Sequence, residues 1–273
     1  MRQIRTGHKP ILDLTLFRGR NFAVAFALMF VLGFCLFGST VLIPQYLQTL
    51  LGYTAERAGM VLSPGGFVLM LMMMVAGRMV SKFDPRWLVC IGYGAVALGL
   101  YNLTRLSLDS AFGTITLWRA LQVIGLPLVF IPISTLNYVG VPPSKSNQIS
   151  SLSNFARNLG GSAGTALLTT FLARTAQTHQ TQLAANTGSF SFGYRNYINS
   201  FASAARAHGM NAVQANQLAV GEAYQQMTRQ SSMLAYKNAF AILAMAIACL
   251  MPLPFIMRLP TKRVKVDPEA MAH

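Results

Sequence analysis

The residues from Asn21 to Pro44 form an apolar run without a charged side chain, and this run constrains the fold more than any other feature. A helix rises about 1.5 Å per residue, so the run is long enough to cross a hydrocarbon core of about 30 Å. A cleaved signal peptide has a shorter apolar core that ends at small residues, and this run does not fit that pattern. We therefore expect a membrane-spanning helix here.

Five further apolar runs follow, separated by charges, glycine and proline. They are Ala58 to Gly77, Trp87 to Thr104, Ala120 to Ser144 (entered from about Phe112, with Arg119 inside), Ser150 to Ala173 and Asn238 to Met257. Only 11% of the residues are charged, whereas soluble domains carry about 25%. The sequence thus predicts an all-α polytopic membrane protein with six transmembrane helices in one bundle.

The net charge of +15 reflects topology rather than a nucleic-acid partner. The 22 lysines and arginines lie between the apolar runs instead of on one polar face. Cytoplasmic connections attract Lys and Arg, and most of these residues fall on the side that holds both termini. We expect a multi-pass membrane protein with both termini in the cytoplasm.

The predicted domain organisation follows from these runs. A basic cytoplasmic segment, 1–20, precedes transmembrane helices one to five in 21–173, and the sixth helix and a basic cytoplasmic tail occupy 237–258 and 259–273. Between them, 174–236 is a long external segment rich in Ala, Gln, Asn, Ser and Thr. Apolar residues recur there at helical spacing, which favours two amphipathic helices; a poorly ordered loop is the alternative.

The sequence contains no pattern for a catalytic, metal or cofactor site. The cysteines lie far apart inside apolar runs, and the histidines form no ligand spacing: Cys35, Cys90, Cys249, His8, His179, His208 and His273. A membrane enzyme would need His, Asp, Glu or Cys residues that converge at one depth, and a phosphate-binding loop of the G-x-x-x-x-G-K type is also missing. We expect neither an enzyme nor an ATP-driven pump.

Several motifs, in this order and spacing, resemble the carboxyl-terminal half of a major facilitator superfamily drug exporter of the fourteen-helix EmrB/QacA type. They are Ile11 to Leu14 with Phe17 to Phe22, Pro44 to Gln48 with Gly52 to Ala55, and Ser150 to Arg157 with Leu159 to Gly164. The resemblance implies proton-coupled export of drugs or other lipophilic compounds across the bacterial inner membrane, with two six-helix bundles rocking around a central cavity. It thereby implies that the external segment 174–236 is periplasmic. It also implies that this chain is one bundle, whose partners are the lipid bilayer, a missing amino-terminal half, a small-molecule substrate and a periplasmic adaptor (membrane fusion) protein.

The resemblance assigns a cytoplasmic loop motif to Gly77, Arg78, Lys82 and Arg86. Ser81 stands where the family has an acidic residue, and Asp84 could serve nearby. The alternative is a plain turn whose positive charges only set the topology.

Arg119, Gln122 and Gly125 resemble the superfamily's R-x-x-Q-G pattern. An arginine inside a span is costly unless it pairs or snorkels, so Arg119 and Gln122 line the substrate pathway or Arg119 reaches the external interface.

Asn154, Arg157 and Asn158 share one helical face that could meet a cavity, although Arg157 could also lie near the headgroups. Gly160 and Gly164 have the G-x-x-x-G spacing of a close helix contact, which indicates packing rather than chemistry.

Gln45 and Gln48, at the external end of the first run, could line the exit of the pathway, although such residues also suit any membrane interface. Each acidic residue lies in a connection: Asp13, Glu56, Asp84, Asp109, Glu222, Asp267 and Glu269. Proton coupling usually needs a titratable group within the membrane, so we expect that group in the missing half. The alternative function is a non-transporting scaffold or truncated remnant whose external segment binds a periplasmic partner.

Overall fold

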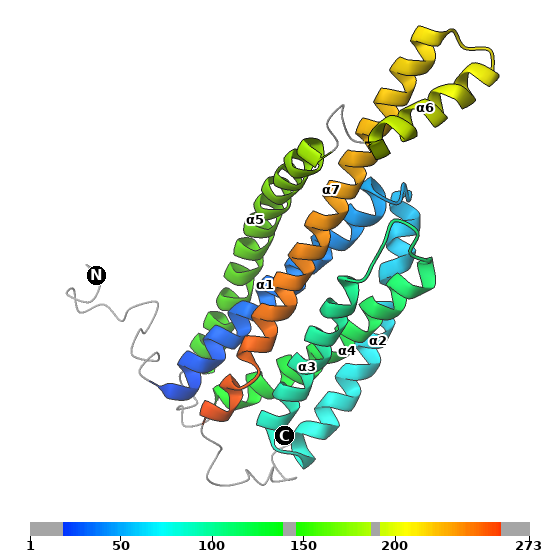
Figure 1. Cartoon of the computed structure of the whole chain (residues 1–273). Helices are drawn as coiled ribbons and strands as arrows, with labels where there is room; N and C mark the ends of the chain where they lie inside the picture. Colours follow the sequence, from blue (N-terminus) through cyan, green and yellow to red (C-terminus); the bar gives the residue numbers. More distant parts are fainter. Residues whose placement is uncertain (1–18, 139–145, 187–191, 258–273) are drawn as a thin grey trace.

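The computed structural model describes residues 19–138, 146–186 and 192–257 (Figure 1). Its elements are α1 Arg20–Thr49, α2 Ala55–Lys82, α3 Pro85–Leu103, α4 Phe112–Asn137, α5 Ser146–Asn186, α6 Phe192–Ala207, α7 Ala212–Leu250 and the short 3₁₀ helix η4 Leu253–Ile256. These three ranges contain no strand, so the all-α prediction is confirmed for them. Most of the predicted basic segments at both ends, and the turn 139–145, lie outside the described residues.

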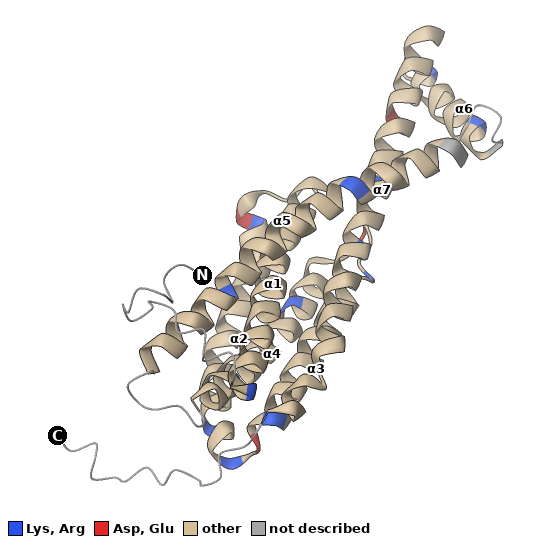
Figure 2. Ribbon diagram, turned by 90° about the vertical axis from the view of Figure 1, so that its left-hand side faces the viewer, with Lys and Arg blue, Asp and Glu red and all other residues tan. Residues whose placement is uncertain are grey.

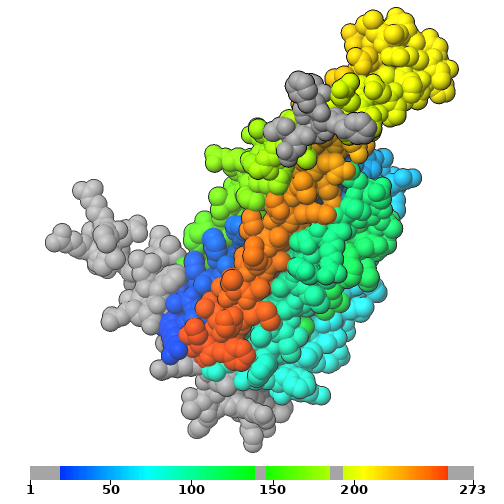
Figure 3. All heavy atoms as spheres, in the orientation of Figure 1, coloured from blue at the N-terminus to red at the C-terminus, as the bar shows by residue number. Residues whose placement is uncertain are grey.

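The long helices form an elongated bundle from which one part projects. α3 packs along α4, α1 along α5, and α2 on the outer side of α4, while α7 contacts both α5 and α3 (Figures 1 and 2). α7 continues past the end of the bundle, and α6 packs against this extension (Figure 3). The first turns of α1 and η4 lie at the opposite end, in contact with each other.

Local sequence signals explain where several helices begin. Thr54 and Asp84 cap α2 and α3 by accepting hydrogen bonds from backbone N–H groups of the first turn, and Pro85 follows as the first residue of α3. Asn211 caps α7 in the same way. Gly52, in the turn between α1 and α2, has φ +67°, a left-handed conformation that favours glycine.

The helices extend beyond some of the predicted runs. α5 begins at Ser146 rather than Ser150 and continues to Asn186. α7 begins at Ala212, far ahead of Asn238, and ends at Leu250 before the η4 turn. The added stretches are rich in Ala, Gln and Leu, which are good helix formers. An apolar run marks only part of such a helix, because backbone hydrogen bonds continue through polar residues that favour the helix.

By length and apolar composition, four helical segments of the described residues can cross a membrane: α1, α2, α4 and Ala212–Ile256. The predicted number of six spanning helices therefore stays a prediction. Helix α2 is notable among the four because little of its surface is covered. Its exposed side chains include Phe67, Met70 and Met74, at 63%, 59% and 55%.

Close backbone contact at glycines joins α1 to α5. A Cβ added at Gly160 would overlap the carbonyl oxygen of Phe30, and one added at Gly164 would overlap that of Phe34. On the other side of the contact, Gly33 faces a carbonyl group of α5 in the same way. Small residues allow such approach in membrane bundles, where dispersion contacts drive helix association. The α1–α5 pair thus depends on three positions that tolerate no side chain.

We predict that Gly160→Leu lowers the yield of folded protein, because the added side chain must push α5 away from the Phe30 carbonyl. Overpacking of this kind costs at least about 1–3 kcal/mol. The measurement is the monodisperse fraction and the thermal midpoint of the purified chain in detergent. Gly66→Leu is the matched control, since a Cβ at this helical glycine of α2 meets nothing within 4 Å. A normal yield for Gly160→Leu would contradict the packing assignment.

Candidate functional site

A charged side chain lies buried between α1 and α4. Arg119 on α4 is only 7% exposed, and its Nη1 donates to the Ser39 Oγ at 3.1 Å and to the Gln122 Oε1 at 2.7 Å. Its Nη2 donates to the Thr40 Oγ1 at 3.1 Å. Gln122, fully buried, donates from its Nε2 to the Ser39 Oγ at 2.8 Å. These four side chains, here called the Arg119 network, join α1 to α4.

The Arg119 network is positively charged. The sequence left open whether Arg119 pairs inside the bundle or reaches the external interface. In the structure its guanidinium lies inside the bundle, where its partners are two hydroxyl oxygens and one amide oxygen. Among the described residues no carboxylate pairs with it. Hydrogen bonds reduce the cost of burying a charge but leave the charge in place. The interior between α1 and α4 therefore carries a buried positive charge.

Glycines bring α3 close to the helix that carries this network. A Cβ added at Gly99 on α3 would lie 2.6 Å from the Gln122 backbone nitrogen. One added at Gly92 would lie 2.8 Å from the Gly125 carbonyl oxygen. Gln122 and Gly125 thus serve the α3–α4 packing, and Gln122 also belongs to the Arg119 network.

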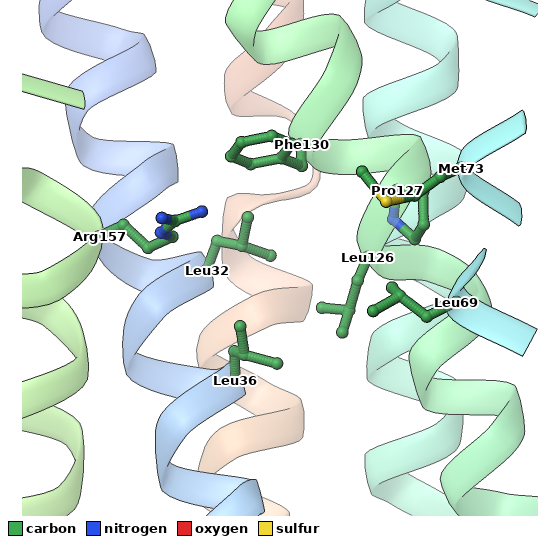
Figure 4. A pocket seen from close by; sticks show the side chains of 8 residues that line it. All are labelled: Leu32, Leu36, Leu69, Met73, Leu126, Pro127, Phe130 and Arg157. Carbon is green, nitrogen blue, oxygen red and sulfur yellow. The ribbon is translucent and has the colours of Figure 1, made fainter. Parts of the chain in front are cut away.

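A second arginine lies at a groove between four helices. The groove, here called the apolar groove, has a volume of about 180 Å³ and a wall of Leu32, Leu36, Leu69, Met73, Leu126, Pro127, Phe130 and Arg157 (Figure 4). Its side chains come from α1, α2, α4 and α5. Arg157 is the one charged residue of this wall, and Figure 4 shows its guanidinium directed toward Phe130.

Arg157 is held by an aromatic ring and an amide. Its Cζ lies 5.3 Å from the centroid of the Phe130 ring, within the range of a cation–π contact. Its Nη2 donates to the Asn154 Oδ1 at 3.1 Å, one turn earlier on α5. The side chain is half-buried, so it is neither at a free surface nor sealed in the core.

A polar pocket adjoins the apolar groove along α4 and α5. It has a volume of about 210 Å³ and is lined by Met29, Phe130, Ser134, Asn137, Tyr138, Ser150, Ser153 and Asn154. The Asn137 Nδ2 donates to the Ser153 Oγ at 2.6 Å, and its Oδ1 is buried without a hydrogen-bond partner. Phe130 borders both spaces, and its ring contacts Arg157 of α5. The apolar groove, the Arg157 cation and the polar pocket are therefore neighbours.

The other proposed pathway residues lie elsewhere. Gln45 and Gln48 are exposed near the end of α1, and Asn158 is exposed on α5. None of the three lines the apolar groove or the polar pocket. Their place in the substrate pathway stays a prediction.

The predicted loop motif spans the end of α2 and the start of α3. Gly77, Arg78 and Lys82 are exposed. The carboxylate of Asp84, the candidate for the missing acidic partner, accepts from the Arg86 backbone nitrogen at 3.0 Å and thus caps α3. The Arg86 Nε is buried without a hydrogen-bond partner.

Three side chains of these sites were not predicted from the sequence. Ser39 and Thr40 supply the acceptors for Arg119, and Phe130 supplies the ring beneath Arg157. A signal for the first two was present, because adjacent hydroxyl residues interrupt an otherwise apolar run. Phe130 offered none, since an aromatic residue in a spanning helix is ordinary.

Within the described ranges no three His, Cys, Asp or Glu side chains are grouped to hold a metal ion.

We predict that Ser39→Ala destabilises the chain by about 1–3 kcal/mol, because two buried donors of the Arg119 network lose their shared acceptor. The measurement is the thermal midpoint in detergent. Ser63→Ala is the matched control, since the exposed Ser63 hydroxyl donates only to the Gly59 carbonyl within α2, and such a change alters stability by at most about 0.5 kcal/mol. Equal midpoints for the two variants would show that Ser39 is dispensable to the network.

Comparison with known proteins agrees with this architecture. The model of the Major Facilitator Superfamily matches residues 2–165. The multidrug export protein EmrB of Escherichia coli K12 is 31% identical over 236 residues, which is 86% of this chain and 44% of that protein. EmrB of Haemophilus influenzae is 36% identical over 180 residues, 65% of this chain and 35% of that protein. The lincomycin resistance protein LmrB of Listeria monocytogenes is 30% identical over 167 residues, which is 61% of this chain and 36% of that protein.

The chain spans less than half the length of the curated relatives it matches. The family match nevertheless covers more than half of the chain, from before α1 into α5. The helical bundle, its apolar helices and this match lead to one conclusion: the chain belongs to the Major Facilitator Superfamily, a family of membrane transporters rather than of enzymes.

Proposed function

We propose that this chain is one bundle of an exporter that moves drugs or other lipophilic compounds across the bacterial inner membrane. The observation that carries this proposal is the apolar groove with Arg157 at its wall, to which α1, α2, α4 and α5 all contribute. A groove shared by four helices changes shape when the helices tilt, as alternating access requires. The printed names of the EmrB relatives, which describe multidrug export, support the same function.

In this proposal α3 and α5 also span the membrane, which gives six spanning helices with α1, α2, α4 and α7. The start of α1 and the η4 helix lie at one end of the bundle, and the basic residues at that end support a cytoplasmic location for it. The opposite end, with α6 and the first half of α7, then lies in the periplasm.

The second bundle of the proposed exporter lies outside this chain. The lengths of the relatives support it, and so does the uncovered face of α2, which a second bundle or lipid would cover. The proposed proton-coupling group belongs to that bundle too. Within the described residues the acidic side chains lie in the first turn of α2, in the cap of α3, in the connection before α4 and in the projecting part of α7: Glu56, Asp84, Asp109 and Glu222.

A scaffold function is the second candidate, and the projecting hairpin of α6 and α7 favours it. Alanines pack α6 onto α7, while Val213 and Tyr224 remain 67% and 58% exposed. Exposed apolar side chains outside lipid suit a protein partner. In this candidate the hairpin binds a periplasmic adaptor and the chain itself transports nothing.

Export of a fluorescent lipophilic dye separates the two candidates. One strain expresses this chain alone, and a second also expresses the amino-terminal half of a related exporter. We expect export only on co-expression, since the pathway lies between two bundles. Absence of export in both strains, with both chains stably inserted, would refute the exporter and favour the scaffold.

We predict that Arg157→Ala lowers dye export by the assembled exporter roughly tenfold, the value of one lost charge-assisted contact. Membrane abundance should stay near that of the unmodified chain, because Arg157 is only half-buried. Immunoblots of membranes measure abundance alongside export. Arg174→Ala, an exposed arginine later on the same helix, is the control and should change neither. Equal losses of export and abundance would mean that Arg157 is structural.

A further inference from the structure

We propose that the polar pocket between the end of α4 and the start of α5 binds a small neutral polyol, whose hydroxyl groups donate hydrogen bonds to oxygen atoms of the pocket wall. The polar pocket is separate from the apolar groove, since the two spaces share only Phe130 among their lining residues. This binding does not depend on the exporter function proposed above, and it can be measured on the chain by itself.

The polar pocket lies beyond the apolar groove, toward the start of α1 and the end of α4. Met29 precedes the groove residue Leu32 by three residues on α1, and Ser134 follows Phe130 by one turn on α4. Figure 4 shows Phe130 at the end of the groove opposite Leu36. A water molecule takes up about 30 Å³ in the liquid. The pocket, with a volume of about 210 Å³, therefore has room for a solute of several heavy atoms.

The wall of the polar pocket presents more acceptors than donors. The Ser134 Oγ donates to the Phe130 carbonyl at 2.8 Å, so its proton is used within α4. The Ser153 Oγ donates to the Ile149 carbonyl at 2.8 Å, so its proton is used within α5. A hydroxyl oxygen has two lone pairs that can still accept. Both serines can therefore accept a hydrogen bond from a ligand, and neither has a proton left to donate.

A buried amide oxygen adds a further acceptor that lacks a donor. Asn137, the last residue of α4, is 2% exposed and lines the polar pocket. Its Nδ2 donates to the Ser153 Oγ at 2.6 Å, whereas its Oδ1 has no hydrogen-bond partner among the described residues. A buried acceptor without a partner is unfavourable, and a hydroxyl group of a bound ligand would remove that cost.

The surroundings of the polar pocket disfavour ions of both signs. The described residues that line it carry no charge, and the N–H groups of Arg157 are not part of its wall. An anion therefore meets mainly oxygen acceptors, to which it has no proton to donate. A cation would lie close to Arg157, whose Nη2 donates to the Oδ1 of the lining residue Asn154 at 3.1 Å. Like charges repel more strongly in an interior of low polarity than in water, so the pocket favours a neutral donor.

A polyol also matches the remaining groups of the wall. Its hydroxyl groups accept as well as donate, and the amide Nδ2 of Asn154 supplies a donor for them. Met29 and Phe130 form an apolar side, against which the C–H groups of a polyol can pack. An alcohol with one hydroxyl group would reach only one of the acceptors. Several hydroxyl groups on one small molecule therefore fit the pocket best.

The test compares three ligands that share one carbon skeleton. D-Glucitol is neutral, D-gluconate is its carboxylate analogue, and 1-amino-1-deoxy-D-glucitol carries an ammonium group. Each is titrated at neutral pH into phosphatidylcholine nanodiscs that contain the full chain, and saturation-transfer NMR follows binding, with empty nanodiscs subtracted. We expect saturable binding of glucitol that is at least about tenfold tighter than binding of either charged ligand, because a charged group loses its hydration in the pocket without replacement.

Variants on one turn of α4 assign the site. Ser134→Ala removes one acceptor and should weaken glucitol binding about fivefold, the value of one neutral hydrogen bond. Ser134→Leu fills the pocket and should abolish binding. The matched controls are Thr135→Ala and Thr135→Leu, since the exposed Thr135 hydroxyl also donates to a carbonyl one turn earlier but does not line the pocket. Both controls should leave glucitol binding unchanged. Ser134→Ala keeps the test valid if the larger Ser134→Leu does not fold.

Three outcomes would overturn the proposal. They are absence of saturable glucitol binding, equal binding of the three ligands, and glucitol binding that survives both substitutions of Ser134. The first would mean that the pocket holds only water, the second that it does not select a neutral ligand, and the third that glucitol binds elsewhere. Dye export by the assembled exporter is a separate measurement. Glucitol binding without dye export would refute only the transport function, and dye export without glucitol binding would refute only the polyol site.

Discussion

The contact between α1 and α5 positions the residues on which the proposed chemistry depends. Gly33, Gly160 and Gly164 let the two backbones touch over successive turns, and the carbonyl that Gly33 faces is that of Arg157 itself. In water a helix pair of this kind would be held mainly by buried apolar area, whereas in lipid close packing has to supply the attraction. A side chain at these positions would therefore both weaken the pair and move Arg157 away from the Phe130 ring.

The Arg119 network allows a cation to be buried in an apolar bundle. Hydroxyl and amide oxygens satisfy its donors, so no carboxylate has to enter the interior with it. A carboxylate would have cancelled the charge and made the interior neutral. Neutral acceptors keep the positive potential and still join α1 to α4, which are two of the helices that form the groove. The same hydrogen bonds thus pack α1 against α4 and hold the buried charge.

The sequence was sufficient to predict helices and close packing but not their partners. Uncharged runs located the cores of α1, α2 and α4 because hydropathy acts on each residue independently of its neighbours in space. The G-x-x-x-G spacing indicated a close helix contact, yet only the structure identifies α1 as the partner of Gly160. Ser39 and Phe130 escaped prediction for a related reason, since their roles depend on arginines that lie far away in the chain. The end of α5 escaped because the helix continues past its apolar run into polar residues, where apolar patterning carries no signal.

Arg119 and Arg157 differ in burial and in how many of their N–H donors have a partner, and this difference links the fold to the proposed transport. Arg119 is sealed by three acceptors and can give up none of them without leaving a buried donor unsatisfied. Arg157 is half-buried, has a ring on one face and keeps donors for a ligand. Arg119 is suited to act as a fixed charge that sets the potential of the groove. Arg157 is suited to pair with a ligand's head group that must bind and then leave. The field of a fully exposed arginine would be screened by water and salt, whereas burial lets the charge of Arg119 act within the bundle.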